Sequence, residues 1–216
     1  MTGKRNTVGL ALLTIIAGAI AFSAMSAPAS SPPKFHFGKI TYTYLTATQS
    51  GTNQLDTAGG NIKCSAVSLS STYSESTVTE GIFSASYSGC TAFGLTAHID
   101  TMGCTYRFTN SEVIHLECPA GNEITVTPTA GGVPVCHVDI PPQTLNATYA
   151  NVAGTPDDMT VTPAAEPVIK YTVTPTDGTT KCGTEGVHSD GRYTGITTVR
   201  AYQDVEHKEQ VELTYN

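Results

Sequence analysis

Apolar and polar residues alternate along most of the chain beyond residue 36, with a period of two. Ile40, Tyr42 and Tyr44 fall on one side of such a stretch, and Thr41 and Thr43 fall on the other. Alternation of this kind is typical of a strand that buries one face. Outside the first 30 residues, no window sustains the 3.6-residue period of an amphipathic helix over three turns. The pattern therefore predicts an all-β protein.

The clearest predicted hairpin runs from Cys104 to Cys118. Both arms alternate, and Thr109 to Ser111 supplies the turn. Folding the arms together pairs Phe108 with Ile114, Tyr106 with Leu116 and Cys104 with Cys118, all on one face. The opposite face then pairs Arg107 with His115 and Thr105 with Glu117, which is a solvated pattern. A disulfide between Cys104 and Cys118 would close this hairpin, and the alternative is that both sulfurs meet partners on another sheet.

The region from residue 98 to residue 140 predicts a larger unit. Beyond the hairpin, Pro119 to Asn122 reads as a turn, and the chain turns again at Thr129 to Gly132. We expect Val126 to face Cys136 and Ile124 to face Val138. The whole region then forms a four-stranded antiparallel meander.

Further short strands are predicted along the rest of the chain. They are expected near residues 37–48, 62–69, 77–87, 145–149, 159–162, 168–174, 193–202 and 210–215. Such spacing, with turn residues between strands, predicts an antiparallel β-sandwich or barrel-like domain over residues 30–216. The alternative is a subdivision near residues 141–155. The 35 threonines and 16 serines agree with an all-β fold, because threonine is β-branched and suits a pleated sheet.

Residues 1–29 have the features of a secretory signal peptide that would form an N-terminal helix. Lys4 and Arg5 precede an apolar run from Val8 to Phe22, and Ala27-Pro28-Ala29 offers a cleavage site. The alternative is an uncleaved membrane anchor, which would need about 20 apolar residues. The run is shorter than that, so we expect export and a secreted, extracellular location. Without cleavage, the domain would be displayed at the cell surface.

The six cysteines all follow the predicted signal peptide. They are Cys64, Cys90, Cys104, Cys118, Cys136 and Cys182. An even number of cysteines in an exported chain predicts three disulfides. Proximity along the chain favours Cys64–Cys90 and Cys136–Cys182 for the remaining two bridges. No pair has the spacing of a zinc ligand set, so we expect no metal and no other cofactor.

The net charge and the aromatic content of the chain limit the classes of partner that we expect it to bind. Without its leader the chain would hold 9 basic and 18 acidic residues, a net charge of −9, which disfavours nucleic acid and anionic membranes. Tyr42 with Tyr44 and Tyr106 with Phe108 could form an aromatic face for an extracellular protein or a glycan. Burial explains both pairs at least as well, and the chain has no tryptophan for a sugar platform.

No catalytic constellation is evident in the sequence. The histidines are scattered, at His36, His98, His115, His137, His188 and His207. The segment His188-Ser189-Asp190 contains the residue types of a serine hydrolase triad, but it has no nucleophile elbow, and it reads as a polar turn. We therefore expect no enzymatic activity. The alternative is a secreted hydrolase with a site built from dispersed Ser, His and Asp residues.

The stretch from Asn61 to about Asp204 carries a set of short motifs. They are Gly-Asn-Ile-Lys-Cys64, Tyr87-Ser-Gly-Cys90-Thr-Ala-Phe-Gly94, Gly103-Cys104-Thr-Tyr-Arg-Phe108, His115-Leu-Glu-Cys118, Lys181-Cys182-Gly183 and Gly191-Arg-Tyr-Thr-Gly195. In these motifs the chain resembles a group of secreted six-cysteine proteins of actinobacteria that has no assigned activity. The resemblance implies export and a shared cysteine framework, and no catalytic residues. The sequence as a whole predicts a secreted, disulfide-stabilised structural or binding module.

Overall fold

The computed structural model describes residues 33–38, 43–154, 158–164, 168–176, 178 and 181–216. The predicted signal peptide and Tyr42 lie outside these residues. Residues Pro32–Asn216 form one compact unit. The described residues form strands and no helix, and every strand pairing is antiparallel, so the predicted all-β fold is confirmed.

Four long strands run the full length of this unit and form what we call the long wall. They are β2 (Thr43–Thr57), β3 (Gly60–Tyr73), β5 (Glu80–Ala92) and β15 (Gly186–Tyr202). Within them, β15 pairs with β2, β2 with β3, and β3 with β5. Alternate residues along β2, such as Leu45, Ala47 and Leu55, are buried, because a strand turns every second side chain inward.

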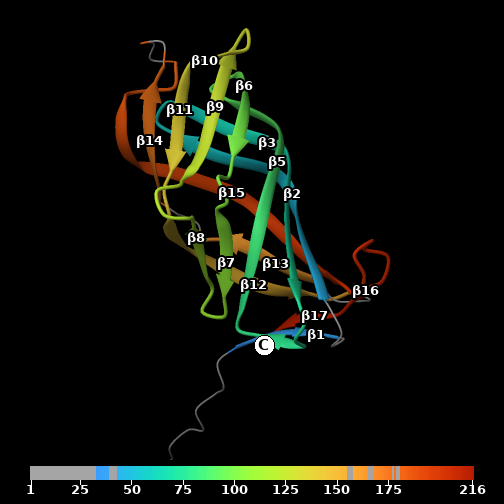
Figure 1. Cartoon of the computed structure of the whole chain (residues 1–216). Helices are drawn as coiled ribbons and strands as arrows, with labels where there is room; N and C mark the ends of the chain where they lie inside the picture. The colour runs from blue at the N-terminus through green and yellow to red at the C-terminus, as the bar shows by residue number, and fades with distance from the viewer. Residues whose placement is uncertain (1–32, 39–42, 155–157, 165–167, 177, 179–180) are drawn as a thin grey trace, which may run out of the picture. The chain divides into compact units, whose positions relative to one another are not determined.

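Two sets of four shorter strands face the long wall, and we name them by their place in Figure 1. The upper half-wall consists of β6 (Leu95–Asp100), β9 (Ile124–Ala130), β11 (Cys136–Ile140) and β14 (Val168–Pro175). The lower half-wall consists of β7 (Thr105–Thr109), β8 (Val113–Glu117), β12 (Gln143–Val152) and β13 (Asp158–Pro163). Two short strands, β10 (Val133–Pro134) and β16 (Gln210–Val211), pair at the ends of β9 and β15.

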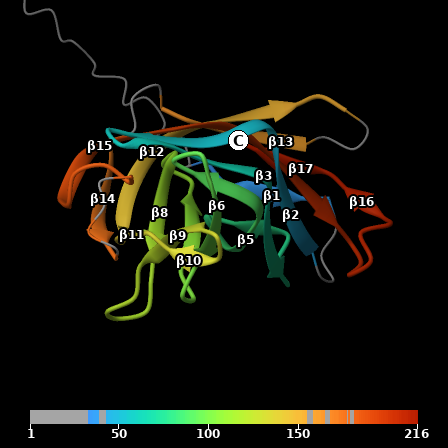
Figure 2. The same cartoon turned by 90° about the horizontal axis from the view of Figure 1, so that it is seen from above.

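Each half-wall closes a ring of strands with the long wall. The two ends of β5 pair with different partners, Glu80–Ser84 with β7 and Cys90–Ala92 with β6. In the same way, the first part of β15 pairs with β14 and a later part pairs with β13. The pairings therefore trace two closed rings that share β2, β3, β5 and β15. Seen from above, β15 runs along one side and β8, β9 and β11 lie along the other (Figure 2).

A separate three-stranded sheet packs onto the core of the lower half. It consists of β1 (Phe35–Phe37), β4 (Thr77–Val78) and β17 (Leu213–Tyr215), with β1 in the middle. Its buried Phe35, Phe37 and Leu213 belong to the same apolar cluster as the lower core. We call this sheet the cap.

The predicted hairpin from Cys104 to Cys118 is confirmed. Strands β7 and β8 pair Phe108 with Ile114, Tyr106 with Leu116, Arg107 with His115 and Thr105 with Glu117. Phe108, Ile114 and Leu116 are buried, and Glu117 is exposed. The hydrophobic pattern fixed this register because a slip of one residue would turn the apolar side chains to solvent.

The predicted four-stranded meander is wrong, because β8 and β9 do not pair. Instead β8 pairs with β7 and β12, while β9 pairs with β6, β10 and β11. Residues 118–123 carry the chain from the lower half-wall to the upper one, as do 141–142 in the reverse direction. Pro119, Pro141 and Pro142 lack the backbone N–H that would continue a ladder, so they interrupt pairing at these crossings.

The predicted register between β9 and β11 is also wrong. Val126 faces Val138 and Ile124 faces Ile140, instead of Cys136 and Val138. The turn is shorter than expected: Gly131 and Gly132, at φ of 60° and 84°, join Ala130 directly to Val133. Both positions need φ above zero in such a hairpin, which glycine supplies without strain. Val135 is then an extra residue, and its N–H donates to the carbonyl of Pro128.

Candidate functional site

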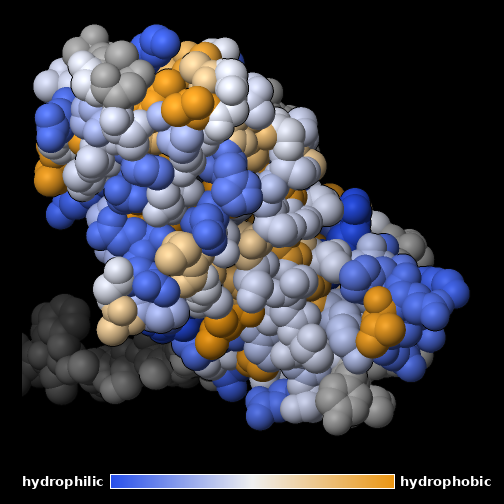
Figure 3. Space-filling model, turned by 45° about the horizontal axis from the view of Figure 1, so that its top comes forward, coloured by the Kyte–Doolittle hydropathy of each residue, from blue (hydrophilic) through white to orange (hydrophobic). Residues whose placement is uncertain are grey.

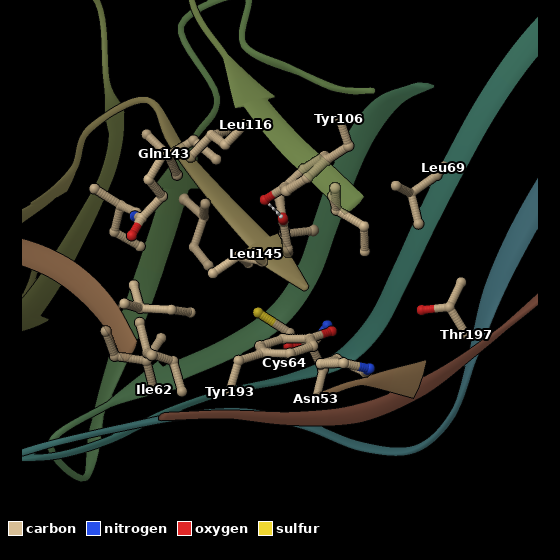
Figure 4. A pocket seen from close by; sticks show the side chains of 18 of the residues that line it. Asn53, Ile62, Cys64, Leu69, Tyr106, Leu116, Gln143, Leu145, Tyr193 and Thr197 are labelled. Atoms are coloured by element: carbon tan, nitrogen blue, oxygen red, sulfur yellow. Dashed lines mark hydrogen bonds between the residues drawn. The ribbon is translucent and has the colours of Figure 1, made fainter. Parts of the chain in front are cut away.

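An apolar cavity of about 130 Å³ lies between the long wall and the two half-walls. We call the line along which the half-walls meet the seam, and no strand pairing among the described residues crosses it. The close-up shows side chains that converge on the cavity from both sides (Figure 4). The cavity is partly open, and the half-buried Ile99, Ile140 and Pro163 line it at the seam.

The lining is apolar apart from a few neutral polar groups. The long wall contributes Asn53, Leu55, Ile62, Cys64, Leu69, Tyr87, Tyr193 and Thr197. The lower half-wall contributes Tyr106, Phe108, Ile114, Leu116, Gln143, Leu145, Val161 and Pro163, and the upper one contributes Ile99, Ile124, Val126, Ile140 and Ile169. None of these side chains is an acid, a base or a histidine.

Two tyrosines form a hydrogen-bonded pair on the cavity wall. The hydroxyl groups of Tyr87 in β5 and Tyr106 in β7 form a hydrogen bond, with their oxygens 2.6 Å apart (Figure 4). Burial raises the pKa of Tyr87 and of Tyr106, because the ionised phenolate would lose its hydration. Both phenols therefore stay protonated over the physiological pH range.

The hydroxyl of a third tyrosine, Tyr193, is a second polar spot in the lining, after the Tyr87–Tyr106 pair. Tyr193 lies beside Asn53 in the close-up, and its hydroxyl accepts a hydrogen bond from Gln49 Nε2 at 3.1 Å (Figure 4). Burial also raises the pKa of Tyr193, while hydrogen bonds from Gln49 and Asn53 oppose this rise. Tyr106 and Tyr87 both interact electrostatically with Tyr193, so the three phenols belong to one region of the cavity.

Gln143 connects the half-walls at the seam. Its side chain acts like a strand backbone: Oε1 accepts from the N–H of Lys170 at 2.9 Å, and Nε2 donates to the carbonyl of Lys170 at 3.1 Å. Lys170 belongs to β14 and Gln143 to β12, and these two strands do not pair through their backbones. The Gln143 side chain thus supplies hydrogen bonds between them. Gln143 also lines the cavity.

All six cysteines are paired as predicted, in Cys64–Cys90, Cys104–Cys118 and Cys136–Cys182. The first bridge joins β3 to β5 within the long wall, and Cys64 lines the cavity. The second joins the segments at which the chain crosses the seam before β7 and after β8. The third joins the start of β11 to the β14–β15 connection. The bridges thus stabilise the walls around the cavity.

The segment His188-Ser189-Asp190 does not form the predicted turn. It lies within β15, at an irregularity where Gly191 pairs with Ile169 and His188 pairs with Tyr171. The ring of His188 stacks on Tyr171 at 5.0 Å, and the Tyr171 hydroxyl donates to Asp190 at 2.8 Å. Asp190 is thus engaged by a tyrosine rather than by the histidine.

Three further histidines lie beside threonine hydroxyls on neighbouring strands, and the ring of His207 packs on Tyr202 at 4.9 Å. The partners are Thr77 for His36, Thr144 for His115 and Thr127 for His137. Nδ1 of His115 lies 3.0 Å from the hydroxyl of Thr144. Within the described part of the chain, no group of three or more His, Cys, Asp or Glu side chains is placed to hold a metal ion.

Of the aromatic residues considered from sequence, Tyr106 and Phe108 both line the cavity, whereas Tyr42 lies outside the described residues. Sequence reasoning missed Tyr87, Tyr193 and Gln143. No local signal marks them, because their roles depend on which strands the rings bring together.

No family model, curated protein or solved structure matches this chain. The resemblance to secreted six-cysteine proteins of actinobacteria therefore stays a prediction. In the part of the chain that the structure describes, no helix is long and apolar enough to cross a membrane.

Proposed function

We propose that this protein is an exported binding module that takes a small apolar molecule into the cavity at the seam, without catalysing a reaction. The observation that carries this proposal is the lining itself, in which aliphatic and aromatic side chains surround a few neutral polar groups. Apolar pockets with a small number of placed polar groups are typical of small-molecule sites.

The size of the cavity limits the ligand. A protein cavity of about 150 Å³ lined by Leu, Ile and Phe stays dry and binds benzene. The cavity here, at about 130 Å³, suits a single ring with one or two small substituents. A ligand of that size gains little binding energy, so we expect a Kd on the order of 0.1–1 mM for an unsubstituted ring.

The disulfides support an extracellular setting for this function. Three bridges without a free cysteine are stable in an oxidising compartment and rare in the cytosol. The predicted signal peptide would deliver the chain there. Together they support a secreted protein whose rigid walls keep the cavity open.

The lining also supports binding rather than catalysis. A hydrolase needs a nucleophile next to a base, and among the described lining residues the groups that carry hydroxyls are Thr197 and three protonated tyrosines. His36, His115 and His137 contact other threonines, on strand pairs that do not include β15, the strand of Thr197. The predicted protein or glycan partner has less support, because exposed apolar residues on the face shown in Figure 3 form separate small groups.

Thermal unfolding with a simple probe tests the proposal. Toluene at ten times its Kd should raise the unfolding free energy by about 1.4 kcal/mol, since only the folded protein has the cavity. Leu145→Trp should fill the cavity and abolish this gain, and Leu116→Phe serves as a milder filling variant. Val133→Trp is the matched control, because Val133 is exposed on β10 and is not part of the lining.

The proposal fails if toluene does not raise the melting temperature of the native protein. It also fails if both filling variants remain folded and keep the full effect of toluene. Near-ultraviolet circular dichroism checks that each variant is folded.

A further inference from the structure

We infer that the natural ligand is a small cyclic molecule with one neutral oxygen acceptor, a ketone or an ether, held by the phenols of Tyr87, Tyr106 and Tyr193. This inference rests on the proposed function and adds the chemical class of the ligand.

The Tyr87–Tyr106 pair has one hydroxyl proton to spare. One hydroxyl donates to the other over 2.6 Å, and the accepting hydroxyl keeps its own O–H. Whichever tyrosine is the donor, one O–H remains, and neither hydroxyl has another hydrogen-bond partner among the described residues. A buried donor without a partner costs free energy, so an acceptor on the ligand would be stabilised there.

Tyr193, which like Tyr87 belongs to the long wall, offers the same chemistry at a second point of the lining. Gln49 Nε2 donates to its oxygen at 3.1 Å, so that oxygen already accepts a hydrogen bond within the protein. The Tyr193 hydroxyl can still donate its own proton. Because the two polar spots both present O–H donors to the cavity, the complementary ligand group is an acceptor.

The surroundings favour a neutral acceptor over an ionised one. Among the residues that the structure describes, no Lys, Arg or His lines the cavity, so a carboxylate would lose its hydration without gaining a counter-charge. The raised pKa values of Tyr87 and Tyr106 have the same cause, because this region disfavours negative charge. A ketone or ether oxygen avoids that cost and still accepts a phenol proton.

A matched set of probes tests the inference on the native protein. Acetophenone and isopropylbenzene have nearly the same shape, and the first carries a carbonyl oxygen where the second carries a methyl group. Benzoate adds a charge. We expect acetophenone to bind, and Tyr87→Phe/Tyr106→Phe to weaken acetophenone about ten-fold while leaving isopropylbenzene within two-fold, as the loss of one hydrogen bond predicts.

Single variants sharpen the test. Tyr87→Phe alone leaves the Tyr106 proton unpaired, so acetophenone should bind nearly as well as to the native protein. Tyr193→Phe should weaken acetophenone and spare isopropylbenzene. Tyr215→Phe is the control, because the Tyr215 hydroxyl donates to the carbonyl of Asn110 outside the cavity.

The outcomes separate the two proposals. If neither acetophenone nor isopropylbenzene binds, the cavity holds water only and the proposed function fails, and this inference fails with it. If isopropylbenzene binds and the double variant weakens both probes equally, the cavity proposal stands and the acceptor inference is wrong. Benzoate binding more tightly than acetophenone would overturn the preference for a neutral ligand.

Discussion

The upper and lower halves of the molecule share four strands but are stabilised in different ways. The lower half packs large aromatic rings, such as Phe83 against Phe108 at 4.8 Å and Tyr149 against Tyr215 at 5.2 Å. The upper half packs mainly aliphatic side chains such as Val138 and Val173 around Tyr171, and its Cys136–Cys182 bridge joins residues 46 apart in sequence.

This difference in packing explains why the cavity lies at the seam. Aromatic packing and the cap fill the lower ring, and aliphatic side chains around Tyr171 fill the upper ring. Where the half-walls meet at the seam, no ladder draws the strands together, and Gln143 makes the connection through its side chain. The space that remains is lined by side chains of both halves.

Removing the upper bridge should have the largest effect. Cys136→Ala/Cys182→Ala deletes a cross-link between residues 46 apart in sequence, which corresponds to about 4 kcal/mol of unfolding free energy. Amide hydrogen exchange should accelerate in β11 and β14 more than in β12 and β13. Denaturant unfolding and exchange mass spectrometry measure both effects. Uniform acceleration in all four strands would show that the halves do not differ.

Removing an apolar side chain from the lower core should destabilise the lower half. Leu213 of β17 is 1% exposed and packs in the lower core, so Leu213→Ala should cost about 3 kcal/mol through the cavity it leaves. Faster exchange should appear first in the cap, at β1 and β17. If β11 and β14 respond as strongly as the cap, the two cores are coupled and the comparison fails.

Alkaline pH should weaken the seam and the lower half, with no effect at neutral pH. Burial raises the folded-state pKa of Tyr87, Tyr106, Tyr149 and Tyr193 above the value of about 10 in an unfolded chain. The unfolded chain therefore releases these protons first. Stability is fully present below pH of about 10 and falls as pH rises toward the folded-state pKa values.

Unfolding curves and tyrosinate absorbance across this pH range measure the loss. Tyr87→Phe/Tyr106→Phe removes two of the buried phenols, so its stability should fall less steeply with pH than that of the native protein. Equal slopes would contradict the burial of these hydroxyls.

Local patterns in the sequence predicted local structure well. The Cys104–Cys118 hairpin was correct in register because its apolar residues can face only one way. Proximity along the chain also predicted the other two bridges correctly. Cys64 and Cys90 lie opposite each other on paired strands.

Long-range pairing was not predictable from the same patterns. Alternation shows which face of β8 is buried but not whether its next neighbour is β9 or β12, so the meander was wrong. The cavity has the same origin, since Tyr87, Tyr106 and Tyr193 line one cavity only because β5 and β15 each belong to both rings. A tyrosine at an inward position of a strand has no sequence signal that separates packing from ligand contact.

A crystal structure of the native protein soaked with para-bromoacetophenone tests the central claim most directly. We predict an anomalous bromine peak inside the cavity, among Leu116, Leu145 and Ile169, with the ketone oxygen within about 3.2 Å of a hydroxyl of Tyr87, Tyr106 or Tyr193. A cavity that holds only ordered water, with bromine confined to the outer surface, would contradict it.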